Sequence, residues 1–469
     1  MKIEQIYTGC LAQGAYYIVS ENEAVIIDPL RETQPYINRA TQDGVAIKYI
    51  LETHFHADFV SGHLDLSKET GATIVYGPNA NPSYPVHIAS DGEVLKVGKI
   101  SIKVLHTPGH TMESSCYLLF DENGKEHALF SGDTLFIGDV GRPDLAQKSA
   151  TMTQEELAGL LFKSLRTKIM TLPDSITVYP AHGAGSACGK NMSKETTDTL
   201  GNQKKTNYAL RQDMTENEFI HEVTNGLLPP PSYFGMNVTL NKSGYESYET
   251  VLNRGMKALS LSEFEELTKD SEVLLLDTRT ASDFANSFIP GSISIGLEGQ
   301  FAPWVGALIP DINQKIVLVT DQDKTEETIK RLARVGYDHV LGYLEDGINT
   351  WKNAEKPLDR IERVTPEELE KELEHKSFVF DVRKPGEYEA EHIENVPSLP
   401  LDYINENMIQ FPKNEAFTIH CAGGYRSIIA ASILKSRGYN QVKDVIGGYS
   451  AISKTNIKRT NFVCPTTIN

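Results

Sequence analysis

Residues 51–63 read LETHFHADFVSGH, and this stretch decides the fold of the first half of the chain. An apolar run leads into His54, His56 and Asp58, three potential metal ligands at alternate positions. Position 59, where a further histidine would complete a two-metal motif, holds Phe59. Because phenylalanine cannot donate to a metal, the stretch predicts either a depleted hydrolase site or a one-metal site with different chemistry.

Three further apolar runs end in polar residues of the same kind. ISIKVLHTPGH ends at His110, HALFSGD ends at Asp133, and ITVYPAH ends at His182. Each run has the composition of a short buried strand. Strands of one sheet that end at the same edge would gather these side chains, so the sequence predicts a metal site there.

The bulk properties narrow the class of protein. A chain of 469 residues with 40% hydrophobic and 23% charged residues is typical of a globular protein of two to four domains. The formal net charge of −18 makes nucleic acid an unsuitable partner, and no apolar run is long enough to span a bilayer. The N-terminus shows no secretory signal, and the five scattered cysteines favour a reducing cytoplasm.

The second half of the chain repeats itself. VLLLDTRTASDFANSFIPGSISI at 273–295 parallels FVFDVRKPGEYEAEHIENVPSLPL at 378–401, and later Gly-Tyr pairs can be aligned as well. In each copy, short β-rich runs alternate with helical stretches, which predicts two α/β domains with mainly parallel sheets. The expected domains are therefore residues 1–250, 256–355 and 360–460.

The first segment resembles the metallo-β-lactamase superfamily. Thr-His-x-His-x-Asp, Thr-Pro-Gly-His, Ser-Gly-Asp and Pro-Ala-His follow one another in that family's order. The resemblance implies an αββα sandwich for this segment. In two-metal members, His54, His56 and His110 would hold one metal, whereas Asp58, position 59 and His182 would hold the other, with Asp133 bridging. With Phe59 in place, His54, His110 and Asp133 remain, a set that suits Fe(II) but does not exclude zinc.

Residues 134–145, TLFIGDVGRPDL, resemble the corresponding loop of persulfide dioxygenases, the iron-dependent branch of this superfamily. That resemblance implies one Fe(II) per chain, held by His54, His110 and Asp133. It places His56, Asp58 and His182 in supporting positions and Arg142 near the substrate, although a surface salt bridge is an equal alternative for Arg142. Many persulfide dioxygenases keep histidine at position 59, so Phe59 is compatible with this activity but not diagnostic of it.

Cys188 lies in AHGAGSACGK, residues 181–190, shortly after His182. One interpretation is a small apolar residue packed in a turn. The other is a thiol at the mouth of the pocket that receives sulfur from the substrate.

Residues 417–438, FTIHCAGGYRSIIAASILKSRG, carry the second functional signal. An apolar strand ends at Cys421, and a Gly-containing loop with Arg426 leads into a helix, an arrangement that favours a thiolate or a persulfide. The loop resembles the active loop of rhodaneses, with Asp381 and Arg383 on the family's neighbouring strand. Four residues separate Cys421 from Arg426, one fewer than in the phosphatase relatives, which suits sulfur rather than phosphate.

The first copy keeps the strand residues but loses the thiol. Asp277 and Arg279 are present, yet its loop reads LVTDQDKTEET and no cysteine occurs between residues 189 and 420. If Asp321 takes the place of Cys421, the loop is two residues shorter. We therefore expect an inactive domain with a structural or interface role.

These resemblances together imply a cytoplasmic persulfide dioxygenase fused to an inactive and an active rhodanese domain. Its partners would be a low-molecular-weight persulfide, O₂, and sulfite or thiosulfate, and the family resemblance implies a homo-oligomer. Two alternatives remain: a thioester hydrolase of the glyoxalase II type with a sulfur-carrying domain, and a sulfur carrier or sensor whose metal site is structural.

Overall fold

The computed structural model describes residues 1–147, 151–227, 229–375 and 377–463, and it divides into two compact units. The first unit comprises Met1–Tyr248 together with Ala333–Gly336. The second comprises Glu249–Leu332 and the chain from Tyr337 onward. No helix in the described ranges is long and apolar enough to cross a membrane.

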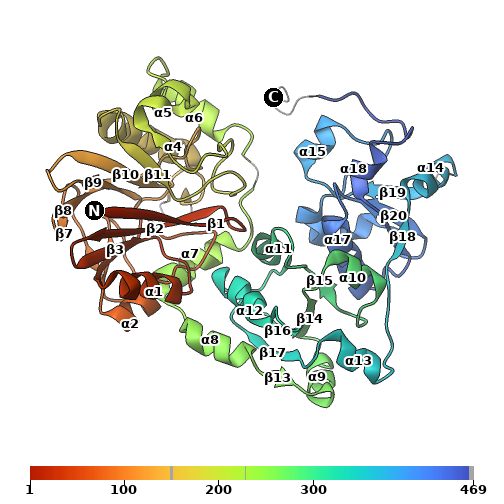
Figure 1. The fold of residues 1–469 in the computed structure, drawn as a ribbon. Coiled ribbons are helices and arrows are strands. Elements are labelled where there is room, and N and C mark those ends of the chain that lie inside the picture. The colour runs from red at the N-terminus through yellow and green to blue at the C-terminus, as the bar shows by residue number, and fades with distance from the viewer. Residues whose placement is uncertain (148–150, 228, 376, 464–469) are drawn as a thin grey trace. The chain divides into compact units, whose positions relative to one another are not determined.

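Two six-stranded sheets form the centre of the first unit (Figure 1). The first sheet contains β1 (Lys2–Thr8), β2 (Gln13–Ser20), β3 (Glu23–Ile27), β4 (Ala46–Leu51), β5 (Thr73–Tyr76) and β6 (His87–Ile88) in sequence order. The second contains β7 (Val94–Val97), β8 (Ile100–His106), β9 (Ser115–Phe120), β10 (Glu126–Gly132), β11 (Thr177–Pro180) and β12 (Asp198–Thr199). A core that includes Ile18, Val25, Ile102 and Phe130 joins the two sheets.

Helices cover the outer face of each sheet (Figure 1). The first sheet packs against α1 (Gln34–Asp43) and α2 (His63–Thr70) through Tyr36, Ala40 and Leu66. The second packs against α4 (Gln154–Ser164), the π-helical turn η1 (Leu165–Ile169) and α6 (Glu216–Thr224). The unit also contains α5 (Leu200–Thr206), η2 (Tyr208–Leu210) and α7 (Phe234–Ser243). This layering confirms the expected αββα sandwich.

The expectation that one sheet carries all four metal-binding strand ends is wrong. His54 follows β4 in the first sheet, whereas His110, Asp133 and His182 follow β8, β10 and β11 in the second. The two sheets pack face to face, so ligands from both reach a common edge. A strand-end pattern identifies such residues, but it contains no information on which sheet each strand joins.

The second unit contains two small parallel sheets. Its first copy has the strand order β13 (Ala258–Leu259), β17 (Val340–Leu344), β16 (Lys315–Val319), β14 (Val273–Asp277) and β15 (Ile293–Ser294). Its helices are α8 (Tyr248–Gly255), α9 (Leu261–Thr268), α10 (Ala281–Asn286), α11 (Phe301–Leu308), α12 (Thr325–Arg334) and α13 (Ile348–Asn353). The first residue of α8 and the last two residues of α12 belong to the first unit.

The second copy has the strand order β18 (Glu362–Val364), β21 (Val442–Val445), β20 (Phe417–His420) and β19 (Phe378–Asp381). Its helices are α14 (Pro366–Glu374), α15 (Pro385–Ala390), α16 (Ile404–Asn407), α17 (Tyr425–Ser436) and α18 (Gly448–Ile452), with short 3₁₀ turns η3 (Leu401–Tyr403) and η4 (Met408–Gln410). The paired strands named above are parallel in both copies, as the alternating pattern predicted.

The strand register identifies the true counterpart of Cys421 in the first copy. Asp381 pairs with His420 in one sheet, and Asp277 pairs with Val319 in the other, so Thr320 follows the strand where Cys421 does. Four residues, 321–324, then precede α12, whereas three, 422–424, precede α17. The alignment of Asp321 with Cys421 is therefore wrong, although the absence of a thiol at this position still holds.

Candidate functional site

His54, His110 and Asp133 form a buried group at the edge of the αββα sandwich. Their ligand atoms lie within 4.8 Å of one another. Asp133 Oδ2 is 3.4 Å from His110 Nε2 and 3.8 Å from His54 Nε2. The three residues that the sequence assigned to one metal therefore do meet, and both histidines turn their Nε2 atoms inward.

Hydrogen bonds on the outer nitrogens hold these two rings in place. His110 Nδ1 donates to the Arg142 carbonyl at 2.9 Å. The Thr53 hydroxyl donates to Asp28 at 2.9 Å, so it accepts from His54 Nδ1, also at 2.9 Å. Burial, and then the neighbouring His56, keep the pKa of His54 well below its usual range. Both Nε2 atoms thus carry lone pairs, the form in which histidine binds a metal.

A second group of potential ligands adjoins the first. His56, Asp58 and His182 bring one ligand atom each within 4.8 Å of the others. His182 Nε2 lies 3.5 Å from Asp58 Oδ2 and 3.6 Å from Asp133 Oδ1, so Asp133 stands between the two groups. Among the described residues, His110 Nε2 and His182 Nε2 are buried without a hydrogen-bond partner, as expected of atoms that face a metal.

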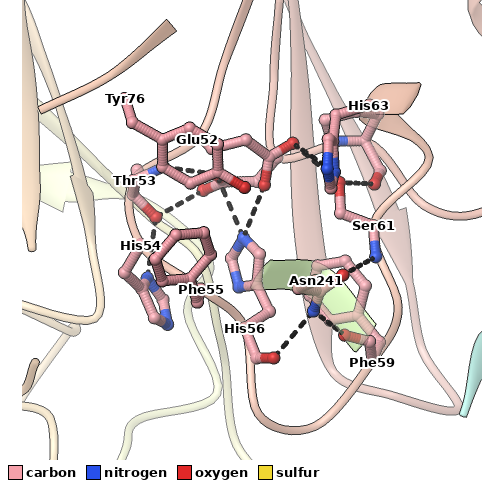
Figure 2. Close-up of polar contacts among 12 residues, drawn as sticks. Glu52, Thr53, His54, Phe55, His56, Phe59, Ser61, His63, Tyr76 and Asn241 are labelled. Atoms are coloured by element: carbon pink, nitrogen blue, oxygen red, sulfur yellow. Dashed lines mark hydrogen bonds and ion pairs between the residues drawn. The ribbon is translucent and has the colours of Figure 1, made fainter. Parts of the chain in front are cut away.

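Phe59, which stands where a two-metal site has a ligand, packs against His56. The two rings stack with centroids 4.3 Å apart and an interplanar angle of 28°. Figure 2 shows the other end of the His56 ring directed at carboxylates: Nε2 is 3.1 Å from Asp28 Oδ1 and 3.5 Å from Glu52 Oε2. Burial lowers the pKa of His56, but these carboxylates outweigh burial and raise it to about 9. The contacts of Nε2 with two carboxylates favour a supporting role for His56.

Asp28 is the residue that sequence reasoning missed. It accepts hydrogen bonds from the Thr53 amide at 2.8 Å and the Thr53 hydroxyl, and it also contacts His56. One carboxylate therefore orients His56 directly and His54 through Thr53. The signal was present, because EAVIID is another apolar run that ends in a carboxylate directly after strand β3.

Arg142 and Cys188 lie on two loops that are joined beside Asp133. The Arg142 amide donates to the Cys188 carbonyl at 2.9 Å, and the buried Arg142 guanidinium pairs with Asp144 at 2.7 and 2.8 Å. The surface salt bridge considered for Arg142 is therefore a buried pair. Cys188, Asp133 and His182 form a further group within 4.8 Å. Burial, with the Asp58 and Asp133 carboxylates, raises the pKa of the Cys188 thiol well above its usual range.

Cys421 occupies the loop between β20 and α17. Its buried sulfur accepts a hydrogen bond from the Gly424 amide at 3.1 Å, and the Ser427 hydroxyl is 3.4 Å away. Ser427 also donates to Asp444 at 2.6 Å. Arg426 forms two hydrogen bonds with Glu387, at 2.6 and 2.8 Å, so a carboxylate balances the charge predicted beside the thiol. Neither Glu387 nor Asp444 was predicted from the sequence.

The Asp-x-Arg strands have the same role in both copies. Arg383 pairs with Asp381 and donates to the Glu391 carbonyl at 2.8 Å. Arg279 pairs with Asp277 and donates to the Ser287 carbonyl at 2.9 Å. Because the copy without cysteine keeps this pair, the pair supports the fold rather than the sulfur chemistry.

Comparison with known proteins agrees with this architecture. A family model described as the metallo-beta-lactamase superfamily matches residues 8–182, and one for the rhodanese-like domain matches residues 260–354 and 365–455. The crystal structure of a metallo-beta-lactamase from Staphylococcus aureus subsp. aureus COL is 33% identical, with a TM-score of 0.65, and the likeness covers 73% of this chain and 98% of that one. The chain belongs to the metallo-β-lactamase superfamily. In this superfamily member, two rhodanese-like domains follow the sandwich.

Its curated relatives include two kinds of enzyme. A probable hydroxyacylglutathione hydrolase of Schizosaccharomyces pombe is 31% identical to this chain. The alignment covers 38% of this chain and 66% of that relative, just under two thirds of its length. The mitochondrial persulfide dioxygenase ETHE1 of Homo sapiens is 29% identical over 47% of the chain and 78% of its own length. Both alignments are shorter than the chain, so the activity is inferred from the site itself.

Proposed function

We propose that the protein is an iron-dependent persulfide dioxygenase with rhodanese activity. It oxidises the outer sulfur of a low-molecular-weight persulfide to sulfite with O₂ and one water molecule, while the S–S bond breaks and the thiol is released. It also exchanges sulfur through Cys421. One Fe(II) per chain would be held by His54, His110 and Asp133. When bound, the ferrous ion supplies open positions at which a sulfur ligand and O₂ can react.

The observation that carries this proposal is the shape of the His54, His110 and Asp133 group. Both histidines are oriented by hydrogen bonds on Nδ1, and both direct Nε2 at the same carboxylate oxygen. Two imidazoles and one carboxylate fit Fe(II). Phe59 occupies the position of a ligand in a two-metal site, and the neighbouring His56 is held by carboxylates.

The chain's own residues surround the reacting atoms with apolar and hydrogen-bonding groups. Phe59 is fully buried and stacks on the ring of His56. Arg142 fixes His110 with its carbonyl and Cys188 with its amide, so one residue aligns the metal side of the pocket with the thiol. We propose that Arg142 and Cys188 form the substrate side of this pocket.

Cys421 performs the second half of the chemistry. A persulfide on Cys421 would be attacked at its outer sulfur by sulfite, which forms the S–S bond of thiosulfate while the Cys421 S–S bond breaks and its thiolate is released. The reverse direction delivers sulfur from thiosulfate to the protein. The Gly424 amide is already placed to donate to the Cys421 sulfur that leaves or attacks. The cytoplasmic location and the homo-oligomeric state inferred from the sequence stay predictions.

A thioester hydrolase is the second candidate, and the group of His56, Asp58 and His182 favours it. Such a hydrolase would need two metals to activate a bridging water. The relative from Schizosaccharomyces pombe is described as a probable hydroxyacylglutathione hydrolase. Phe59 at the position of a ligand to the second metal, and the contacts of His56 with Asp28 and Glu52, oppose a two-metal site.

One experiment separates the candidates. The full chain is loaded anaerobically with Fe(II) or with Zn(II), the metal content of both samples is measured, and both O₂ uptake with glutathione persulfide and hydrolysis of a glutathione thioester are recorded. We expect one iron per chain, persulfide-dependent O₂ uptake and sulfite as product. Two tightly held zinc ions with thioesterase activity would establish the hydrolase, and a bound metal with neither activity would establish the carrier or sensor.

A further inference from the structure

A cleft of about 770 Å³ lies beside the Cys421 loop, and both rhodanese-like copies line it. The active copy contributes the loop residues Gly423 to Arg426 together with Arg363 and Lys384. The opposite wall comes from the copy that has no cysteine. Its contribution includes Glu298, Gln300 and Trp304, which come after β15 and from α11.

The wall without cysteine is fastened to the active loop within the second unit. The Tyr425 hydroxyl donates to the Gly296 carbonyl at 2.8 Å. The Tyr425 ring also covers Gly299, where an added Cβ would lie 3.3 Å from the ring at a φ of +102°. On the same helix, Ser432 Oγ accepts from the Ser294 amide at 2.9 Å. Segment 294–299 is therefore held directly against the helix that begins at the loop.

The size and charge of the cleft indicate the class of ligand. Cavities of roughly 300–1,000 Å³ accommodate organic molecules, so inorganic thiosulfate would leave most of this one unfilled. Lys384 places positive charge on the wall of the active copy, whereas Arg363 is paired with Asp444 at 3.2 Å and Arg426 is balanced by Glu387. Exposed Glu298 places negative charge on the facing wall, and Trp304 adds apolar surface.

We propose that the cysteine-less copy forms half of a binding site for an amino-acid or peptide persulfide that exchanges sulfur with Cys421. A carboxylate of the ligand pairs with Lys384, and its ammonium group pairs with Glu298. Gln300 and Trp304 contact the rest of the ligand. Glu298, Gln300 and Trp304 are thus specificity-determining residues, and this inference rests on the proposed sulfur transfer through Cys421.

The reaction needs no further reactant. The Cys421 thiolate attacks the outer sulfur of the persulfide, a new S–S bond forms on Cys421, and the S–S bond of the donor breaks. The electron pair of that bond leaves with the donor's inner sulfur as a thiolate, which takes up a proton from water. Recognition of the organic part of the donor places its outer sulfur at the loop.

The test compares two donors on the full chain. Sulfur transfer to cyanide, which yields thiocyanate, is measured with glutathione persulfide and with thiosulfate, for wild type and for the double variant Glu298→Gln with Gln300→Ala. The matched control carries Glu266→Gln with Gln314→Ala, which lie in the same copy but do not line the cleft. We expect the KM for glutathione persulfide to rise about tenfold or more in the cleft variant, because charge-assisted contacts are lost. The KM for thiosulfate should stay within about twofold of wild type, and the control should match wild type.

An equal rise in KM for both donors would show that the wall acts only on the structure of the loop. Unchanged KM values would show that the wall does not contact the donor, and either result overturns the proposal. Binding of reduced glutathione to Cys421→Ser, measured by calorimetry, examines the site without any transfer. Weakened binding in the cleft variant supports the proposal, and no binding to Cys421→Ser overturns it. A wild-type chain that binds glutathione yet forms no Cys421 persulfide would instead contradict the proposed function.

Discussion

Position 59 shows how a single side chain can separate two chemistries on one scaffold. The Phe59 ring stacks on His56, and the Asn241 side chain donates to the backbone carbonyls of both residues at 2.8 Å (Figure 2). The backbone at this position is therefore fixed, and only the side chain decides whether a ligand is present. Asp58 and His182, the other two candidate ligands of a second metal, lie 3.5 Å apart.

We expect Phe59→His to gain, at most, a weak second metal site and no thioesterase activity at a rate typical of hydrolases. The new imidazole would lie in a fully buried apolar position, which costs about 2–4 kcal/mol of stability. Metal analysis, thermal unfolding and a thioester hydrolysis assay measure the metal content, the stability and the activity of the variant. Efficient hydrolysis with two bound zinc ions would show that Phe59 alone suppresses the hydrolase.

Asp28 has a separate effect on the metal site. Asp28→Asn should weaken iron binding by about 10- to 100-fold, a range typical of residues that orient metal ligands. The amide replaces an oxygen that accepts from Thr53 or His56, so at least one imidazole loses its fixed orientation. Iron affinity is measured by competition with a chelator, and Asp43→Asn, at an exposed carboxylate of the same sheet's helix layer, is the control. Equal iron affinity in both variants would contradict the role given to Asp28.

The residues of the metal group could be predicted from sequence because each one ends an apolar run. The same rule pointed to Asp28, which escaped notice because it lies outside the motif. Glu387 and Asp444 could not be found this way. Their roles depend on contacts with Arg426 and Ser427 that only the folded chain creates.

At the scale of elements, the loop after β10 is packed against the metal group without spare room. A Cβ added at Gly141 would lie 2.1 Å from the Asp133 carbonyl oxygen and 2.9 Å from His110 Nδ1. The next residue, Arg142, supplies the carbonyl that orients His110. The glycine thus permits the close approach on which the hydrogen bond depends.

We expect Gly141→Ala to lower both iron content and O₂ uptake by about tenfold or more, because the loop must move away from Asp133 and His110 loses its acceptor. Gly235→Ala in α7 is the matched control, since a Cβ there meets no atom within 4 Å. Metal analysis and oxygen-electrode rates of both variants are the measurements. A Gly141→Ala protein with full iron content would show that the loop relaxes without cost to the site.

Elements were predictable where the pattern is local. The parallel sheets of the two copies and the helix after the Cys421 loop follow from alternating apolar runs and a Gly-rich loop. The alignment of Asp321 with Cys421 failed because it was anchored on a distant Gly-Tyr pair rather than on strand pairing. The register between strands arises from tertiary packing, so it cannot be obtained by counting residues between sequence motifs.

For the whole molecule, the metal group and the sulfur loop lie in different compact units. Among the described residues, His54, His110 and Asp133 all belong to the first unit, and the residues that line the Cys421 cleft all belong to the second. In the proposed function, a persulfide free in solution serves either site. The persulfide oxidation and the sulfur transfer are then coupled through small molecules such as sulfite.

In the proposed function, the metal group and Cys421 carry out separate reactions. Cys421→Ser should abolish thiosulfate formation while persulfide-dependent O₂ uptake remains largely intact, so the product shifts from thiosulfate to sulfite. A serine hydroxyl is not ionised at neutral pH and forms no persulfide, whereas the His54, His110 and Asp133 group is unchanged. Ion chromatography of sulfite and thiosulfate beside O₂ uptake provides the measurement, with His110→Ala as the variant expected to lose O₂ uptake. Loss of O₂ uptake in Cys421→Ser as complete as in His110→Ala would make Cys421 an obligatory donor to the metal site. Thiosulfate formed at the wild-type rate would place the sulfur relay on another thiol, and Cys188, buried beside Asp133, is the thiol to substitute next.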